Sequence, residues 1–129
     1  ALGVCDPSVE DPLKRSLSMS KHVVVVLSEP VKGRESEFDD WYENTHIPEV
    51  LDTTGWTSGQ RFKLTAEKGQ KCPLQYLAFY EAEAESGDAV VARLDETRSK
   101  RQQSDSFDWK RAGLWVFTET GPKRDRHEN

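Results

Sequence analysis

The sequence has only two cysteines, Cys5 and Cys72, and it has no long hydrophobic run. Two cysteines cannot form a disulfide framework, and neither lies in a CxxC pair or a cysteine–histidine cluster that would hold zinc. We therefore expect a reduced, cytoplasmic compartment and no metal site. The longest apolar run, residues 22–27, is far shorter than the roughly 20 residues of a membrane-spanning helix, so we expect no membrane partner.

Positive charge is in the minority, with 18 basic against 23 acidic side chains and a net charge of -5 at pH 7. A sequence-independent nucleic-acid binder needs a basic surface, so we do not expect nucleic acid as a partner. The sequence also contains no Gly-rich phosphate loop, no HExxH and no GxSxG motif. If the protein is an enzyme, we expect it to work without a metal or nucleotide cofactor.

The chain of 129 residues is long enough for one domain with a modest core. Its composition is 35% hydrophobic and 32% charged, so completing the core by oligomerisation is plausible. Residues 1–20 are polar and interrupted by proline, without the apolar core of a secretory signal, and we interpret them as an N-terminal extension. We expect the domain over residues 21–120, starting just after Met19, and a charged C-terminal tail over residues 121–129.

Hydrophobic periodicity predicts strands at residues 22–28, 56–65, 74–81 and 113–120, and helices at 35–46 and 86–101. Strand, helix, strand, strand, helix, strand is the order of the ferredoxin-like α+β fold (βαββαβ), a four-stranded antiparallel sheet with both helices on one face. Three of the strands are apolar on both sides, which indicates that both faces of the sheet are covered. Pairing of two such sheets in a homodimer would cover the second face.

The most distinctive stretch is residues 38–51, FDDWYENTHIPEVL. Phe38, Trp41, Tyr42 and Thr45 follow the spacing of one helix face. Pro48 has no N–H to give to the preceding turn, so we predict that the helix stops or kinks near His46.

His46 is the strongest candidate for chemistry, because a histidine with an ordinary pKa near 6.5 exchanges protons at neutral pH. The alternative is a structural imidazole that caps the carbonyl groups freed by Pro48. Tyr42, one turn earlier on the same face, could hold a substrate oxygen or could be a core aromatic residue.

The segment Phe38-x-x-Trp41-Tyr42-x-x-x-His46-Ile47-Pro48-Glu49-Val50-Leu51, with Gly55-Trp56 and Arg61-Phe62, resembles the EthD-like branch of the dimeric α+β barrel proteins. The resemblance covers residues 21–120. It implies ferredoxin-like protomers whose sheets pack face to face and a pocket between the sheet and the helices. Activities in this superfamily include polyketide cyclisation, dehydration, cofactor-free oxygenation of aromatic substrates and haem degradation, so the resemblance implies fold and dimer more strongly than it implies function.

This resemblance supplies further candidate pocket residues. Trp41 is either core or a substrate contact, and His22, at the start of a strand, either points into the pocket or lies on the surface. On residues 56–65, Gln60 and Phe62 face one way and Arg61 the other. One of these two sets should line the pocket, and if the Arg61 set does so, Arg61 is the better anion anchor. Tyr76, Phe79, Tyr80, Trp115 and Phe117 should form pocket wall or dimer core.

The leading hypothesis is a cofactor-independent enzyme of the lyase, cyclase, dehydratase or oxygenase type. It would act on a small hydrophobic aromatic or polyketide-like molecule, with His46 as general acid or base and Tyr42 placing a substrate oxygen. The alternative is a non-catalytic protein that binds a ligand in the same pocket. A weaker third option is a haem-degrading monooxygenase with His46 or His22 as the axial ligand.

Overall fold

The computed structural model describes residues 19–127, so the expected extension over residues 1–20 lies almost wholly outside the described residues. The elements follow the predicted order: β1 (Ser20–Ser28), α2 (Glu35–Trp41), η1 (Tyr42–His46), α3 (Ile47–Thr54), β2 (Ser58–Lys63), β3 (Tyr76–Ala84), α4 (Gly87–Thr97), η2 (Arg98–Lys100) and β4 (Gly113–Thr118). Ser86 is the N-cap of α4, and its hydroxyl accepts a hydrogen bond from the Ala89 N–H at 3.1 Å. No helix within residues 19–127 is long and apolar enough to cross a membrane.

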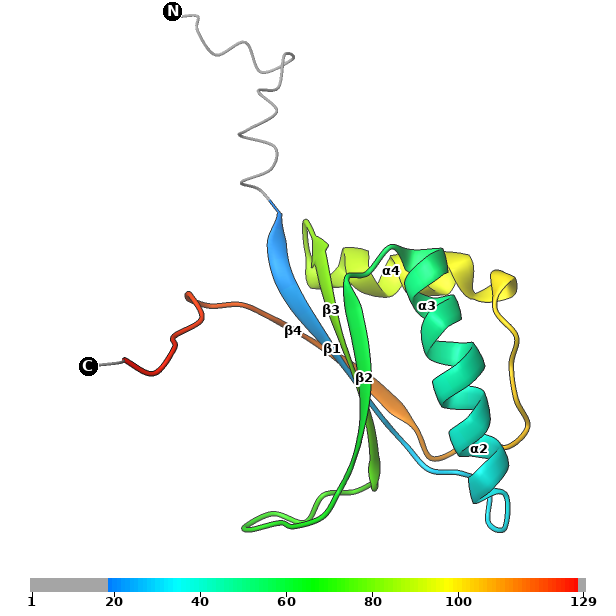
Figure 1. Cartoon of the computed structure of the whole chain (residues 1–129). Helices are drawn as coiled ribbons and strands as arrows, with labels where there is room; N and C mark the ends of the chain where they lie inside the picture. The colour runs from blue at the N-terminus through cyan, green and yellow to red at the C-terminus, as the bar shows by residue number, and fades with distance from the viewer. Residues whose placement is uncertain (1–18, 128–129) are drawn as a thin grey trace, which may run out of the picture.

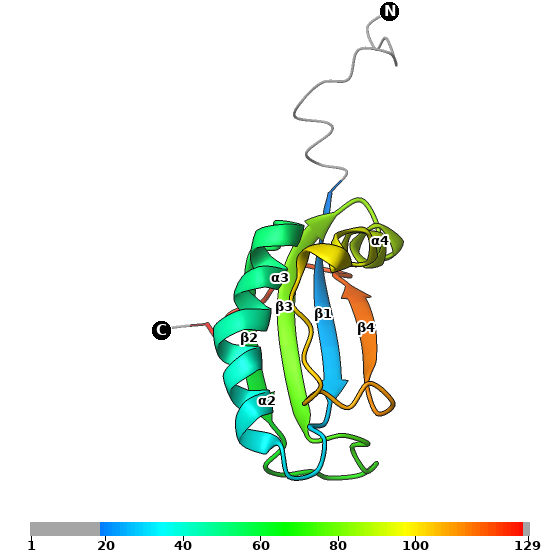
Figure 2. The same ribbon diagram turned by 90° about the vertical axis from the view of Figure 1, so that its right-hand side faces the viewer.

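The four strands form one antiparallel sheet in the order β2-β3-β1-β4 (Figure 1). In this order β2 and β3 form the expected hairpin, and β1 lies between β3 and β4. The helices all lie on one face of the sheet (Figure 1), which confirms the ferredoxin-like α+β fold. The α2–η1–α3 segment runs along the β2–β3 side, whereas α4 crosses above one end of β1 and β4 (Figure 2).

The connection over residues 101–112, between η2 and β4, also runs over the helical face of the sheet (Figure 2). It is anchored to the end of β1 by backbone hydrogen bonds from Val31 N–H to the Ser106 carbonyl at 2.7 Å and from Asp108 N–H to the Glu29 carbonyl at 3.0 Å. Phe107 on this connection is 5% exposed and packs against Phe38 and Trp41. The connection therefore completes the helical layer where α4 leaves the sheet uncovered.

The helix does not stop before Pro48, but its α-helical hydrogen bonding is interrupted near His46, where the sequence predicts a stop or a kink. Residues 35–54 run on as one helical element, and the segment before Pro48 is a π-helical turn, in which the Ile47 N–H bonds to the Tyr42 carbonyl. Pro48 then occupies the first turn of α3, where a missing N–H breaks no helical hydrogen bond.

The register of buried side chains explains the π turn. Phe38 and Trp41 before the turn and Tyr42 at its start are buried; after it, Ile47, Val50 and Thr54 are buried. An uninterrupted α-helix starting from Phe38 would place residues 45 and 49 on this face instead of 46 and 50. The π turn accommodates one extra residue and brings His46, rather than Thr45, onto the face that Tyr42 and Val50 share.

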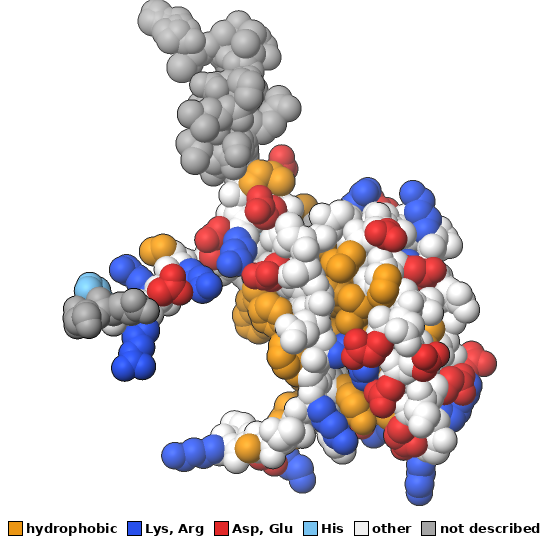
Figure 3. Space-filling model, in the orientation of Figure 1, with side chains coloured by type: hydrophobic (Ala, Val, Ile, Leu, Met, Phe, Trp, Pro, Cys, Tyr) orange, Lys and Arg blue, Asp and Glu red, His pale blue; other side chains and the backbone are white. Residues whose placement is uncertain are grey.

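The core lies between the helical layer and the sheet, where Phe38, Tyr42, Tyr80, Val24 and Val90 are each at most 2% exposed. The opposite face of the sheet carries a second apolar surface in regular cross-strand rows, because Phe79, Val25 and Trp115 are neighbours in the ladder. Phe62, Trp115 and Phe117 on this face are 47%, 46% and 58% exposed. We call it the open face; its hydrophobic side chains show along the side of the sheet away from the helices (Figure 3).

Candidate functional site

A cavity of about 270 Å³ lies between the sheet and the helical layer. Side chains from η1, α3, α4, η2, three strands and the 101–112 connection line it: Val26, Tyr42, His46, Val50, Trp56, Tyr80, Leu94, Asp95, Arg98, Arg101, Gln103, Phe107, Trp109, Ala112, Gly113 and Leu114. Exposed lining residues, among them Arg98 and Trp109, mark the side that faces solvent. The guanidinium of Arg98 lies 5.1 Å from the centre of the Trp109 ring on that side.

His46 enters the cavity from the π turn. Its ring stacks on the Trp41 ring, with 4.4 Å between the ring centroids. It packs nearly perpendicular to the Tyr42 ring, with 5.1 Å between the centroids. Its Nδ1 atom is buried and has no hydrogen-bond partner among the described residues. Burial, and after it the positive charge of Arg101, lowers the pKa of His46 to about 4, so the imidazole is neutral at pH 7. The capping role considered for His46 is not seen, since its side chain caps no helix end.

Tyr80 on β3 supplies a second free polar group, because its hydroxyl is buried without a hydrogen-bond partner among residues 19–127. Burial raises the pKa of Tyr80 well above its ordinary value, which keeps the phenol protonated and able to donate. Gly59 on the neighbouring strand makes room for the ring: a Cβ at this position would lie 2.8 Å from it. Burial also raises the pKa of Tyr42, which is 1% exposed.

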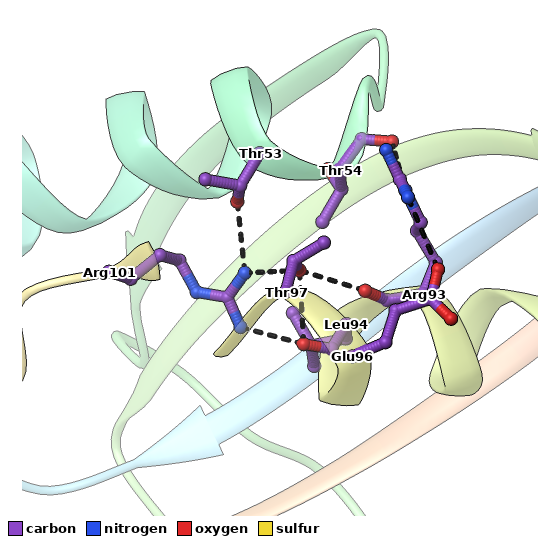
Figure 4. Close-up of polar contacts among 7 residues, drawn as sticks. All are labelled: Thr53, Thr54, Arg93, Leu94, Glu96, Thr97 and Arg101. Carbon is purple, nitrogen blue, oxygen red and sulfur yellow. Dashed lines mark hydrogen bonds and ion pairs between the residues drawn. The ribbon is translucent and has the colours of Figure 1, made fainter. Parts of the chain in front are cut away.

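Arg101, just after η2, brings a buried positive charge to the cavity and is 8% exposed. Its Nη1 donates to the hydroxyls of Thr53 and Thr97 at 2.9 and 2.7 Å, and its Nη2 donates to the Leu94 carbonyl at 2.9 Å (Figure 4). Arg101 thereby ties α3 to the end of α4. Its Nε is buried and unpartnered among the described residues. Burial lowers the pKa of Arg101, although a guanidinium stays charged in proteins.

Of the side chains that the sequence predicts for the pocket, His46, Tyr42 and Tyr80 line the cavity. Trp41 stacks behind His46 and donates from Nε1 to the Gln102 carbonyl at 3.0 Å. Tyr76 lies outside the cavity, edge-on to Phe38. Neither Trp41 nor Tyr76 lines the cavity, so the assignment of these two residues to substrate binding stays a prediction.

His22 is 1% exposed, so the alternative that it lies on the surface is wrong. Its Nε2–H donates to the Ala84 carbonyl at 3.0 Å, and the Thr118 hydroxyl lies 2.9 Å from Nδ1. Both ring nitrogens are therefore engaged, which leaves none for a haem iron, and His22 does not line the cavity.

Successive side chains of β2 point to opposite faces of the sheet, as predicted from the sequence. Gln60 and Phe62 project from the open face, and Arg61 projects toward the helices. However, Arg61 is fully paired: its Nη2 lies 2.8 Å from Asp39 and its Nη1 lies 2.9 Å from Glu43. Its guanidinium also packs over the Tyr42 ring at 4.9 Å. Arg61 therefore holds η1 to the sheet and is not an anion anchor in the cavity.

Sequence reasoning missed Arg101 and left Tyr80 undecided. Tyr80 could be named only as pocket wall or dimer core, because both faces of its strand are apolar. Arg101 stands in a polar, highly charged stretch with no periodicity to mark it as buried. Residues 19–127 contain no cluster of three or more His, Cys, Asp or Glu side chains that could hold a metal ion.

No protein-family model matches this chain, and no curated protein matches it. Its structure is similar to the crystal structure of an EthD (ethyl tert-butyl ether D) family protein from Bacillus halodurans C-125, with a TM-score of 0.54 and 18% sequence identity. The similarity covers 78% of this chain and 99% of the other. At 18% identity this similarity shows the fold alone. For the fold, the expected likeness to EthD-like dimeric α+β barrel proteins is confirmed.

Proposed function

We propose that this protein is a cofactor-independent enzyme that transfers protons on a small hydrophobic molecule, aromatic or polyketide-like, bound in the cavity. His46 is the acid–base group, and Tyr80, beside the predicted Tyr42, holds a substrate oxygen. The observation that carries the proposal is that a neutral His46 and Tyr80 line the same cavity, and that His46 Nδ1 and the Tyr80 hydroxyl are both buried without a hydrogen-bond partner among residues 19–127. Buried polar atoms without partners are uncommon in proteins, and they gather at functional sites.

The chemistry that these groups support is enolisation. Nδ1 of His46, in the tautomer protonated at Nε2, accepts a proton from a carbon next to a substrate carbonyl. The electron pair of the broken C–H bond moves toward the carbonyl oxygen, where the Tyr80 hydroxyl donates a hydrogen bond to the developing enolate. His46 then returns the proton to another atom of the substrate, which gives isomerisation, or to a departing hydroxyl, which gives dehydration.

The low pKa of His46 also supports a second candidate function, which is ligand binding without catalysis. An imidazole with a pKa of about 4 is a weak base at neutral pH unless substrate binding raises that pKa. The two functions use the same cavity, so they are separated by turnover and not by binding.

Deuterium exchange tests the catalytic function without knowledge of the natural substrate. The probe is 2-tetralone, a two-ring ketone with exchangeable C–H bonds next to its carbonyl, followed by proton NMR in D₂O. We expect the wild-type protein to accelerate exchange and His46→Gln to lose at least about tenfold of that acceleration, since a positioned base contributes roughly 10²–10⁴-fold.

His127→Gln is the matched control, because it makes the same substitution at a histidine outside the cavity. Circular dichroism of each variant checks the fold. Exchange that proceeds equally in His46→Gln removes His46 from the mechanism. A wild-type protein that binds 2-tetralone without accelerating exchange supports the binding function instead.

The homodimer belongs to this proposal. The open face carries half-exposed Phe62, Trp115 and Phe117, whereas the helices cover only the other side of the sheet. An exposed apolar surface of this kind marks an association site. The proposed partner is a second copy of this chain, packed sheet against sheet.

A further inference from the structure

We infer that the ligand of the cavity is an anion, an aromatic carboxylate of about two fused rings, and that Arg101 binds its carboxylate. The inference deepens the proposed function, on which it rests for the choice of cavity. It assigns the charge and size of the ligand, and it adds Arg101 as the residue that selects it.

The first argument is charge, and two buried arginines of this chain provide the comparison. The Arg61 side chain is 9% exposed and is paired with two carboxylates, Asp39 and Glu43. Arg101 is buried to a similar extent, yet it takes part in none of the ion pairs within residues 19–127. Its partners are two hydroxyls and a carbonyl. Glu49 and Asp95 act on its charge only from beyond ion-pair distance. A buried charge without a paired counter-charge is costly, and an anionic ligand would supply one.

The second argument is the count of hydrogen-bond donors. A guanidinium has five N–H groups. Two on Nη1 are taken by the Thr53 and Thr97 hydroxyls, and one on Nη2 is taken by the Leu94 carbonyl, as Figure 4 shows. The Nε–H and the second N–H of Nη2 remain, and two donors are what a bidentate carboxylate accepts. Because the threonine hydroxyls and the helix carbonyl fix the guanidinium, the ligand does not have to order it.

The third argument is the shape and lining of the cavity. Away from Arg101 its wall is largely apolar and aromatic, including Val26, Val50, Trp56, Phe107 and Leu114. An apolar protein cavity of about 150 Å³ is large enough for benzene. At about 270 Å³ this cavity has room for roughly one ring more. The Tyr80 hydroxyl and His46 Nδ1 are left for further polar groups on the rings.

Isothermal titration calorimetry on the full chain tests the inference with two isosteric probes, 2-naphthoate and 2-naphthamide. They share the ring system and differ in charge. We expect the wild-type protein to bind the carboxylate about tenfold or more tightly than the amide, because charge-assisted hydrogen bonds are roughly twice as strong as neutral ones. Arg101→Gln should abolish the preference.

Arg93→Gln is the matched control, since Arg93 lies on α4, contacts the Thr54 carbonyl and Glu96, and does not line the cavity. It should keep the preference. Equal affinities for the two probes in the wild-type protein, a preference that survives Arg101→Gln, or no binding of either probe would each overturn the inference.

Arg101 also joins α3 to α4, so Arg101→Gln could fail to fold. A measurement on the wild-type protein then decides: the ¹⁵N–¹H NMR signal of the Arg101 Nε–H should shift with 2-naphthoate and stay in place with 2-naphthamide. Failure of the proposed catalysis is recognised separately. His46→Gln should retain the carboxylate preference, so absent deuterium exchange with an intact preference refutes only catalysis, and lost preference with intact exchange refutes only the anionic ligand.

Discussion

Acidification should destabilise this protein through His46, and replacing His46 by Gln should remove that part of the pH dependence. In the folded protein the pKa of His46 is lowered to about 4, by burial first and by the charge of Arg101 second. In the unfolded chain the imidazole has its ordinary pKa of about 6.5. Above pH 6.5 neither state protonates His46, and below about pH 4 both do. Between these limits the unfolded state binds more protons, so the free energy of unfolding falls as the pH falls.

The size of the effect follows from the same two values. Over this window each pH unit removes up to about 1.4 kcal/mol from the free energy of unfolding. The whole span from pH 6.5 to about 4 therefore corresponds to roughly 3 kcal/mol. Since small domains are stable by only about 5–15 kcal/mol, a loss of this size shifts the unfolding midpoint visibly.

Urea unfolding followed by tryptophan fluorescence, in steps from about pH 7 to about pH 4, measures the effect. Partly exposed acids such as Glu81 and Asp108, whose pKa values are lowered first by their hydrogen bonds with Ser58 and Arg111, are present in both proteins. Their contributions cancel when the curve of His46→Gln is subtracted from that of the wild type. The difference should be flat above pH 6.5 and should fall toward pH 4. Parallel curves would show that His46 is not desolvated in the folded protein, and a direct NMR titration of its ring would locate the error.

Three further outcomes are expected. Gly59→Ala should lower the free energy of unfolding by about 1–3 kcal/mol, because the added Cβ would lie 2.8 Å from the Tyr80 ring, whereas Gly121→Ala, which meets nothing within 4 Å, should leave thermal unfolding unchanged. Ser86→Ala should cost about 1 kcal/mol in the same assay through loss of the α4 cap, and an unchanged midpoint would contradict that role. Phe117→Asp on the open face should halve the mass measured by light scattering, and a mass equal to that of the wild type would exclude this face as the dimer surface.

The fold could be predicted from the sequence because its strands and helices leave strong periodic signals. The run of valines in β1 and the aromatic residues of β3 and β4 indicate strands whatever their neighbours are, and the element order then restricts the topology. The missing N–H of Pro48 predicts a stop or a kink near His46, and the α-helix is interrupted there but does not stop. In the structure a π turn places that proline in the first turn of α3, where no N–H is needed.

The site could be predicted only in part. His46 and Tyr42 were found because they share a helix face, which is a local property of the sequence. The roles of Tyr80 and Arg101 depend on contacts between segments far apart in the chain, such as the 2.9 Å hydrogen bond from Arg101 to Thr53. Arg61 and Arg101 are both charged residues in polar surroundings of the sequence. Only the structure shows that Asp39 and Glu43 neutralise the first and that no acidic side chain within residues 19–127 pairs with the second.

The π turn at Tyr42–His46 also affects how this chain is compared with others of the same fold. A deletion inside an α-helix normally turns everything beyond it by about 100° and exposes its buried side. Here the helical element already holds one residue more than an α-helix needs, so loss of one residue within 42–46 would let α2 and α3 keep their buried faces. A sequence alignment with a protein of this fold whose helix lacks the π turn should therefore allow a one-residue gap in the middle of this helix, a place where gaps are ordinarily penalised. Without that gap, the residue paired with His46 in such a protein would be shifted by one position from the buried helix face.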